Sequence, residues 1–130
     1  MPNRSNHRNI IAQPVLNSNN VTINVLTNST AVDVKGRDAQ HFNITTIAAS
    51  AAGVVTLEDS ADGVTYAAVD ATQVEGDGII STVVPATTAI AYLGVKQYVR
   101  AVLPASKAWN GVITAVGSSY NQVPVNPKQV

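Results

Sequence analysis

His7 and His41 are the two side chains of this sequence that could act as general bases, and Ser60 beside Asp59 is its nearest approach to a hydrolase pattern. A serine–histidine–acid triad needs the three groups within hydrogen-bond reach of one another. Nothing in the sequence brings them together, because Ser60 falls in a predicted turn and His41 at the head of a predicted strand. The chain contains no cysteine, which excludes thiolate nucleophiles, disulfides and cysteine metal sites. We therefore expect no catalytic residue and no enzymatic activity.

Acidic side chains gather in the middle of the chain, where their oxygens could bind calcium. They are Asp59, Asp62, Asp70, Glu75 and Asp77. The segment 59–63 lacks the ligand spacing of a helix-loop-helix calcium site, and no bidentate glutamate follows at the required distance. Turn-forming aspartates that bond to their own backbone explain the same residues. We therefore predict no metal and no cofactor.

The composition indicates a protein that binds other proteins. Charged residues make up only 12% of the chain, about half the usual share, and a freely diffusing monomer usually keeps a more charged surface. Eight basic and eight acidic residues give zero net charge, so we expect no binding to nucleic acid or to an anionic membrane. No apolar run has the length of a membrane span, and the polar N-terminus lacks the apolar segment of a secretory signal. We therefore expect synthesis in the cytoplasm without export by that route.

Short β-branched runs alternate with turn residues at the spacing of a sandwich or barrel. Strands are predicted at 10–16, 21–25, 31–35, 41–47, 54–58, 64–69, 79–84, 89–93, 97–103 and 111–116. Helix-period segments are absent, although 48–52 could form one helical turn. The predicted class is all-β, an antiparallel β-sandwich or jelly-roll-like single domain over 10–119. A polar N-terminal arm at 1–9 and an extended C-terminal tail at 120–130 flank this domain.

Alternation within the strands predicts which side chains face the core. The predicted inward set is Val21, Ile23, Val25, Phe42, Ile44, Val55, Leu57, Tyr66, Val83, Tyr92, Tyr98, Val102 and Ile113. Gly63 is predicted to take the left-handed conformation in a hairpin turn at 59–63. Gly94 is predicted to need positive φ in a second hairpin, over 92–102. Arg100 should then point away from the core, alternating with Val99.

Six residues are candidates for contact with a partner. They are Arg4, Arg8, Lys96, Arg100, Trp109 and Tyr120. The first two belong to the polar arm, and Lys96 and Arg100 are placed to meet an acidic surface. Trp109, the only tryptophan, could anchor an interface or fold back over the core, and the sequence favours neither. With Tyr120 it could also form a platform for stacking on sugars.

Three stretches carry a resemblance to a known group of proteins. They are 34–42 (VKGRDAQHF), 55–69 (VTLEDSADGVTYAAV) and 92–102 (YLGVKQYVRAV). Together they resemble small virion proteins of tailed bacteriophages, commonly encoded close to the major capsid protein. Where this chain has Gln97, related sequences usually carry a basic residue.

The resemblance implies a structural virion protein on the capsid exterior. Such a decoration or cement protein would stabilise the capsid by bridging neighbouring major capsid protein subunits, and we expect it to be a homo-oligomer. A head–tail adaptor, terminator or tail-tube subunit is the alternative within the virion, and a carbohydrate-binding β-sandwich module is the alternative from another class. The arm and the tail are expected to become ordered only through contacts with other subunits, because neither can bury enough apolar surface alone.

Overall fold

A computed structural model describes residues 9–19, 22–35, 37–104 and 108–119 of the chain. This part confirms the all-β class and contains twelve strands and one turn of 3-10 helix, Ala71–Gln73. The strands are β1 (Asn9–Asn17), β2 (Thr27–Asn28), β3 (Val32–Asp33), β4 (Arg37–Ala48), β5 (Gly53–Val54), β6 (Thr56–Ser60), β7 (Ala67–Ala68), β8 (Val74–Gly76), β9 (Ile79–Ile80), β10 (Ala86–Tyr92), β11 (Tyr98–Leu103) and β12 (Asn110–Ser119). Within these residues no helix is long and apolar enough to cross a membrane.

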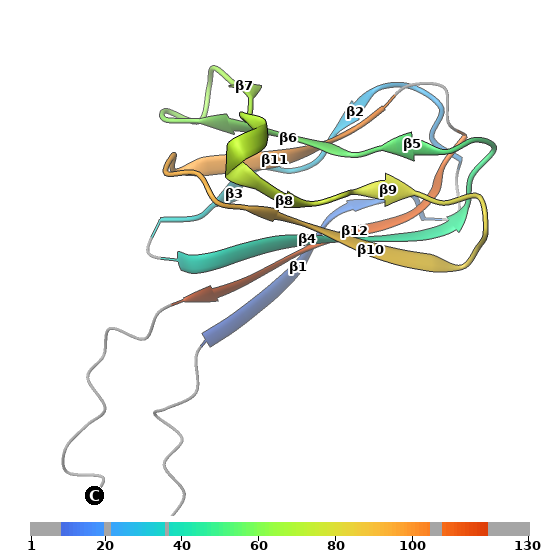
Figure 1. The fold of residues 1–130 in the computed structure, drawn as a ribbon, viewed down its shortest axis with the longest axis horizontal. Helices are drawn as coiled ribbons and strands as arrows, with labels where there is room; N and C mark the ends of the chain where they lie inside the picture. The colour runs from blue at the N-terminus through green and yellow to red at the C-terminus, as the bar shows by residue number, and fades with distance from the viewer. Residues whose placement is uncertain (1–8, 20–21, 36, 105–107, 120–130) are drawn as a thin grey trace, which may run out of the picture.

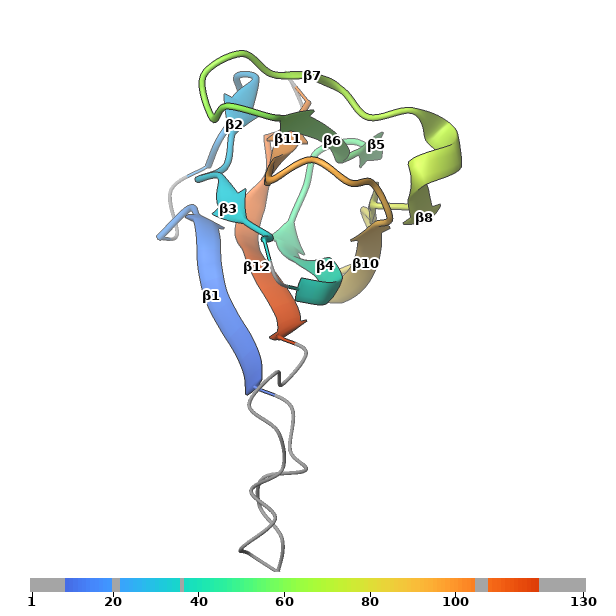
Figure 2. The same ribbon diagram turned by 90° about the vertical axis from the view of Figure 1, so that its left-hand side faces the viewer.

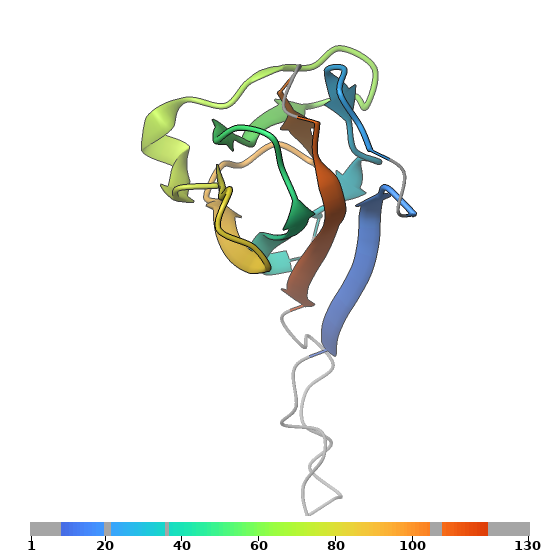
Figure 3. The same ribbon diagram turned by 90° about the vertical axis from the view of Figure 1, so that its right-hand side faces the viewer.

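Two antiparallel sheets face each other as a sandwich (Figure 1). The first sheet has the order β1-β12-β4-β10-β8, and the second has the order β2-β11-β6-β7, with β3 also paired to β11. A small β5–β9 sheet joins the layers, because β5 leads into β6 and β9 leads towards β10. Strands β1 and β12 lie side by side and extend beyond the rest of the sandwich (Figure 2, Figure 3).

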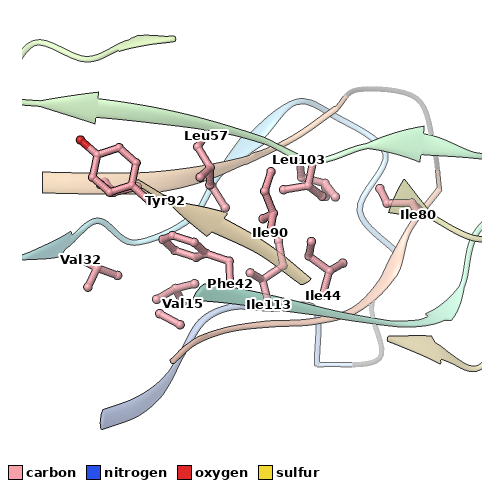
Figure 4. Close-up of a cluster of buried hydrophobic side chains, with 14 of the residues drawn as sticks. Val15, Val32, Phe42, Ile44, Leu57, Ile80, Ile90, Tyr92, Leu103 and Ile113 are labelled. Carbon is pink, nitrogen blue, oxygen red and sulfur yellow. The ribbon is translucent and has the colours of Figure 1, made fainter. Parts of the chain in front are cut away.

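The core fills the space between the two sheets (Figure 4). Its largest fully buried apolar side chains are Trp109, Phe42, Ile44, Ile80, Leu103 and Ile113. Burying one large apolar side chain stabilises a fold by roughly 1.5–3 kcal/mol. Both sheets contribute side chains to this layer, so the core brings into contact strands that are distant in sequence.

The predicted core is right for the central strands and wrong at two positions outside them. Seven predicted residues are buried, namely Phe42, Ile44, Val55, Leu57, Tyr92, Val102 and Ile113. Ile23, Tyr66 and Tyr98 are partly buried, and Val21 lies outside the described residues. Val25 and Val83 are 62% and 81% exposed. The cause is that Val25 precedes β2, and that the strand predicted at 79–84 ends at Ile80, so neither valine lies in a strand.

The predicted hairpin over 92–102 is wrong. β10 pairs with β4 and β8, whereas β11 pairs with β2, β3 and β6, so residues 93–97 cross from one sheet to the other. Gly94 does not adopt positive φ, and its small size is needed because a Cβ there would collide with the Tyr92 hydroxyl. In contrast, Gly63 takes φ of 78° as predicted. Val99 is fully buried while Arg100 is only partly so, which confirms their predicted alternation.

Two further expectations concern the ends and one connection of the chain. No helical turn forms at 48–52, where β4 ends at Ala48 and bends follow. Asn9 lies opposite Ser119 across the β1–β12 ladder, so the segments 1–8 and 120–130 both adjoin the domain at one corner. The arm and tail themselves, with the candidate contacts Arg4, Arg8 and Tyr120, lie outside the described residues.

Candidate functional site

A buried carboxylate, Asp59, organises one end of the sandwich, where β6 ends and β10 crosses to β11. Its side chain accepts a hydrogen bond from the Tyr92 hydroxyl at 2.8 Å, and the Lys96 ammonium lies 3.6 Å from its other oxygen. The Lys96 backbone N–H in turn donates to the Tyr92 hydroxyl at 3.0 Å. We call Asp59, Tyr92 and Lys96 the Asp59 cluster. These contacts hold the 93–97 connection against the end of the core.

The electrostatics of the Asp59 cluster suit a structural role. Burial, together with the hydrogen bond to Asp59, raises the pKa of Tyr92 to about 12. The hydroxyl therefore stays protonated at ordinary pH, and it already both donates and accepts one hydrogen bond. The Lys96 side chain is 47% exposed, so its ammonium can reach a partner while remaining near Asp59.

Arg100, one of the predicted partner contacts, is already paired within the domain. Its Nε and Nη2 atoms donate to one Glu58 carboxylate oxygen at 2.9 and 2.7 Å. Its guanidinium also lies 4.0 Å from the centre of the Tyr66 ring, within cation–π range. These contacts follow from the β11–β6 register, which sets Arg100 opposite Glu58. Contact of Arg100 with an acidic partner stays a prediction and would compete with these pairs.

The Ser60 and Asp62 side chains build a turn. The Ser60 hydroxyl donates to Asp62 at 2.8 Å and accepts the Gly63 N–H at 2.9 Å. Asp62 also accepts the backbone N–H groups of Thr65 and Val64, at 3.0 and 2.9 Å. These hydrogen bonds, from Thr65 first, lower the pKa of Asp62 to about 2. The prediction that these aspartates bond to their own backbone is confirmed for Asp62, whereas Asp59 bonds to the Tyr92 side chain.

The residues considered for catalysis or metal binding do not converge. His41 lies on β4 opposite Ala91 and Val116, on strands that do not carry Ser60 or Asp59. Asp70 caps the 3-10 helix by accepting the Thr72 N–H at 2.9 Å. Across the described ranges no three His, Cys, Asp or Glu side chains come close enough together to hold a metal ion.

Trp109 is part of the core. Its side chain is fully buried, and its indole N–H donates to the Thr46 hydroxyl at 3.0 Å. Its backbone N–H and C=O both pair with Ile23. The expectation that Trp109 contacts a partner or a sugar is therefore wrong, because the ring is enclosed between the sheets. The interpretation that it folds back over the core is the one that the structure supports.

A group of exposed aliphatic side chains at the opposite end is a feature that the pattern within single strands does not reveal. Its exposed large side chains are Ile47, Val54, Ile79, Val83 and Val84, which we call the apolar end (at the right in Figure 1). The β5–β9 pairing sets Val54 opposite Ile79, and Thr46 opposite Ala86 brings Ile47 near the 81–85 connection. Contiguous exposed apolar surface marks sites of interaction.

A signal for the apolar end is present in the sequence. Residues 42–57 and 78–95 contain no Asp, Glu, Lys, Arg or His, and all five side chains of the apolar end belong to these two stretches. Five other described large hydrophobic residues are exposed. Val25 and Leu26 precede β2, whereas Val64, Leu93 and Val95 lie towards the opposite end, near the Asp59 cluster. No family model, curated protein or solved structure matches this chain. Its function is therefore inferred from its own residues and surfaces.

Proposed function

We propose that this chain is a structural virion protein that decorates a capsid and stabilises it by bridging neighbouring major capsid protein subunits. The observation that carries the proposal is the apolar end, which exposes five large aliphatic side chains and no charge in the stretches that form it. The low overall charge and the resemblance of 34–42, 55–69 and 92–102 to phage virion proteins support it.

The size of the apolar end indicates how such binding would work. Its five side chains are between 39% and 81% exposed, so burying what remains would contribute roughly 4–8 kcal/mol, from about 1.5–3 kcal/mol for each fully buried side chain. Association itself costs about 4–15 kcal/mol in lost freedom of motion. One apolar end on one capsid subunit would therefore bind weakly. A copy that spans two subunits, or adds a second contact through its termini, gains from effective concentration.

Bridging is also what would stabilise the particle. A ligand that binds only the assembled arrangement shifts the equilibrium away from separated subunits. Asn9 and Ser119 place both terminal segments at one corner of the domain, which offers an attachment point separate from the apolar end. The carbohydrate-binding alternative is less favoured, because the buried Trp109 ring is not available to stack on a sugar.

The test uses virus particles from a genome that encodes this chain and particles from which its gene is deleted. Mass spectrometry of purified particles should find the chain at a copy number comparable to that of the major capsid protein. Deletion should lower the temperature at which particles release their genome, and adding the purified full-length chain should restore it. Six or twelve copies per particle would instead indicate a neck or tail ring and overturn the decoration proposal.

Two variants with equal exposure locate the binding surface. Val83 and Val64 are each 81% exposed, and they lie at the apolar end and at the opposite end of the sandwich. Val83→Asp should bind deleted particles at least ten-fold more weakly, whereas Val64→Asp should bind as the unchanged chain does. Neither change should shift the free energy of unfolding by more than about 0.5 kcal/mol, because both sites are on the surface. Equal binding by both variants would exclude the apolar end as the contact.

A further inference from the structure

β1 is the one long strand at the edge of a sheet in the described part of the molecule. It has nine residues and lies at the edge of the first sheet. The other edge strands, β2, β3, β7 and β8 and the β5–β9 pair, have two or three residues each. Proteins keep edge strands short or charged because their free backbone groups recruit further strands. β1 contains no charged residue, so it lacks the usual protection.

Among the described residues, only the N-terminal half of β1 has no strand or loop bonded to its outer edge. Further along, the Thr30 N–H donates to the Val15 carbonyl at 2.9 Å, which closes that part of the edge. The side chains of Ala12, Gln13 and Pro14 are all exposed, although successive residues of a strand point to opposite faces. At 12–14 the strand therefore has solvent on both faces, and Figure 2 shows the backbone of β1 extending past the rest of the sandwich.

Pro14 defines which backbone groups face outward. Proline has no N–H, so within a sheet its nitrogen is directed away from the ladder. The β1–β12 register shifts between Pro14 and Leu16, which lets the Val15 carbonyl also face this edge. Before that shift the backbone orientation repeats every two residues, and Ile10 and Ala12 therefore present their N–H and C=O groups to the same open side as Pro14. A strand that pairs with this edge can use both residues fully, and must stop at Pro14.

We propose that this open edge pairs with the same edge of a second copy of the chain, antiparallel about a twofold axis. Ile10 of one copy then lies opposite Ala12 of the other, and each of the two such pairs exchanges two backbone hydrogen bonds. The same register sets Asn9 opposite Gln13. The proposal goes beyond capsid decoration, and it holds whether or not the chain binds a capsid.

Two properties of the strand favour a second copy as the occupant. Because β1 is uncharged, placing it against itself brings no like charges together. A twofold contact is also closed, whereas pairing β1 with the opposite edge of another copy would form an open chain of subunits. That opposite edge, β8, has only three residues and follows directly on the 3-10 helix.

Sedimentation equilibrium of the full chain over a range of concentrations tests the pairing. The unchanged protein should reach twice the 13.5 kDa mass of one chain. Ala12→Pro removes the outward N–H at an exposed position and should sediment as a single chain. Ala12→Val keeps that N–H and is the matched control, so it should remain a dimer. A single-chain mass for the unchanged protein at every concentration would refute the proposal.

A charge pair provides a second test that does not depend on how Ala12→Pro folds. In the proposed register the two Ala12 side chains are one diagonal step apart on the same face, within reach of long side chains. Ala12→Lys alone and Ala12→Glu alone should each dimerise several-fold more weakly, and an equimolar mixture should recover the dimer as a mixed species. Absence of recovery, with circular dichroism showing both variants folded, would place the contact elsewhere.

Discussion

Tyr92→Phe removes a single oxygen from the Asp59 cluster and should destabilise the domain by about 2–3 kcal/mol. The lost hydroxyl donates to a buried carboxylate at 2.8 Å, and a hydrogen bond to a charged group contributes about 1.5–3 kcal/mol. It also accepts the Lys96 N–H, but this donor lies in an exposed connection and can turn to water, so its loss adds little. The ring itself, 6% exposed, stays packed in phenylalanine.

The pKa of Tyr92 predicts how this stabilisation changes with pH. A rise from 10.0 to about 12 corresponds to about 2.7 kcal/mol at 1.36 kcal/mol per unit. This is an upper limit for the hydrogen bond to Asp59, because burial of the hydroxyl is the largest cause of the rise. Since the folded pKa is raised, the stabilisation is complete below pH 10 and is lost as the pH rises through about 12.

Urea unfolding of the unchanged chain and Tyr92→Phe at pH 7, 9, 10, 11 and 12 measures both effects. The difference in free energy of unfolding should be constant up to pH 9 and should shrink towards zero by pH 12. Tyr98→Phe is the matched control, because the Tyr98 hydroxyl has no hydrogen bond to any described residue, and it should differ from the unchanged chain by less than about 0.5 kcal/mol. A Tyr92→Phe difference below about 0.5 kcal/mol, or one unaffected by alkaline pH, would refute the role assigned to the hydroxyl.

Three further predictions concern the core and the 59–63 turn. Leu57→Ala should lower the free energy of unfolding by about 2–5 kcal/mol, because Leu57 is 3% exposed; a cost under about half a kcal/mol in urea would contradict its burial. Asp62→Ala should be less stable than the unchanged chain at pH 5 but not near pH 2, because the lowered pKa of Asp62 means that its stabilisation disappears as the pH falls through about 2. A difference in urea midpoint that persists unchanged at pH 2 would be inconsistent with the turn. Trp109, fully buried, should emit at short wavelength and resist acrylamide quenching, and quenching as efficient as that of free tryptophan would show that it is exposed.

Local sequence pattern was sufficient where one strand could be interpreted by itself. The alternation of Phe42 and Ile44 predicts their burial on β4, and that of Val55 and Leu57 does the same around β6. Turn chemistry was equally informative at Gly63, whose φ of 78° is one that residues with a Cβ rarely adopt. These features depend on a few adjacent residues, so the chain determines them before any tertiary contact forms.

The sequence could not determine which strands pair. Side chains alternate with a period of two in every strand, whether two successive strands pair as a hairpin or belong to different sheets. Only the assembled sandwich shows that 93–97 changes sheets, and this crossing allows Tyr92 to bond with Asp59, 33 residues earlier. Trp109 shows the same limit, since a tryptophan in a predicted loop has no periodic neighbours that would predict which way its side chain points.

The same distinction holds for the two candidate surfaces, whose composition could be predicted from the sequence but whose assembly depends on the tertiary structure. The absence of charge from 42–57 and 78–95 can be counted in the sequence, but the β5–β9 pairing is what brings Val54 and Ile79 together. Likewise Pro14 marks β1 as an edge strand, while the Thr30 contact decides how much of that edge stays open. Composition fixes what a surface is made of. Long-range pairing decides which residues share it, because that choice depends on how all the strands pack around a common core.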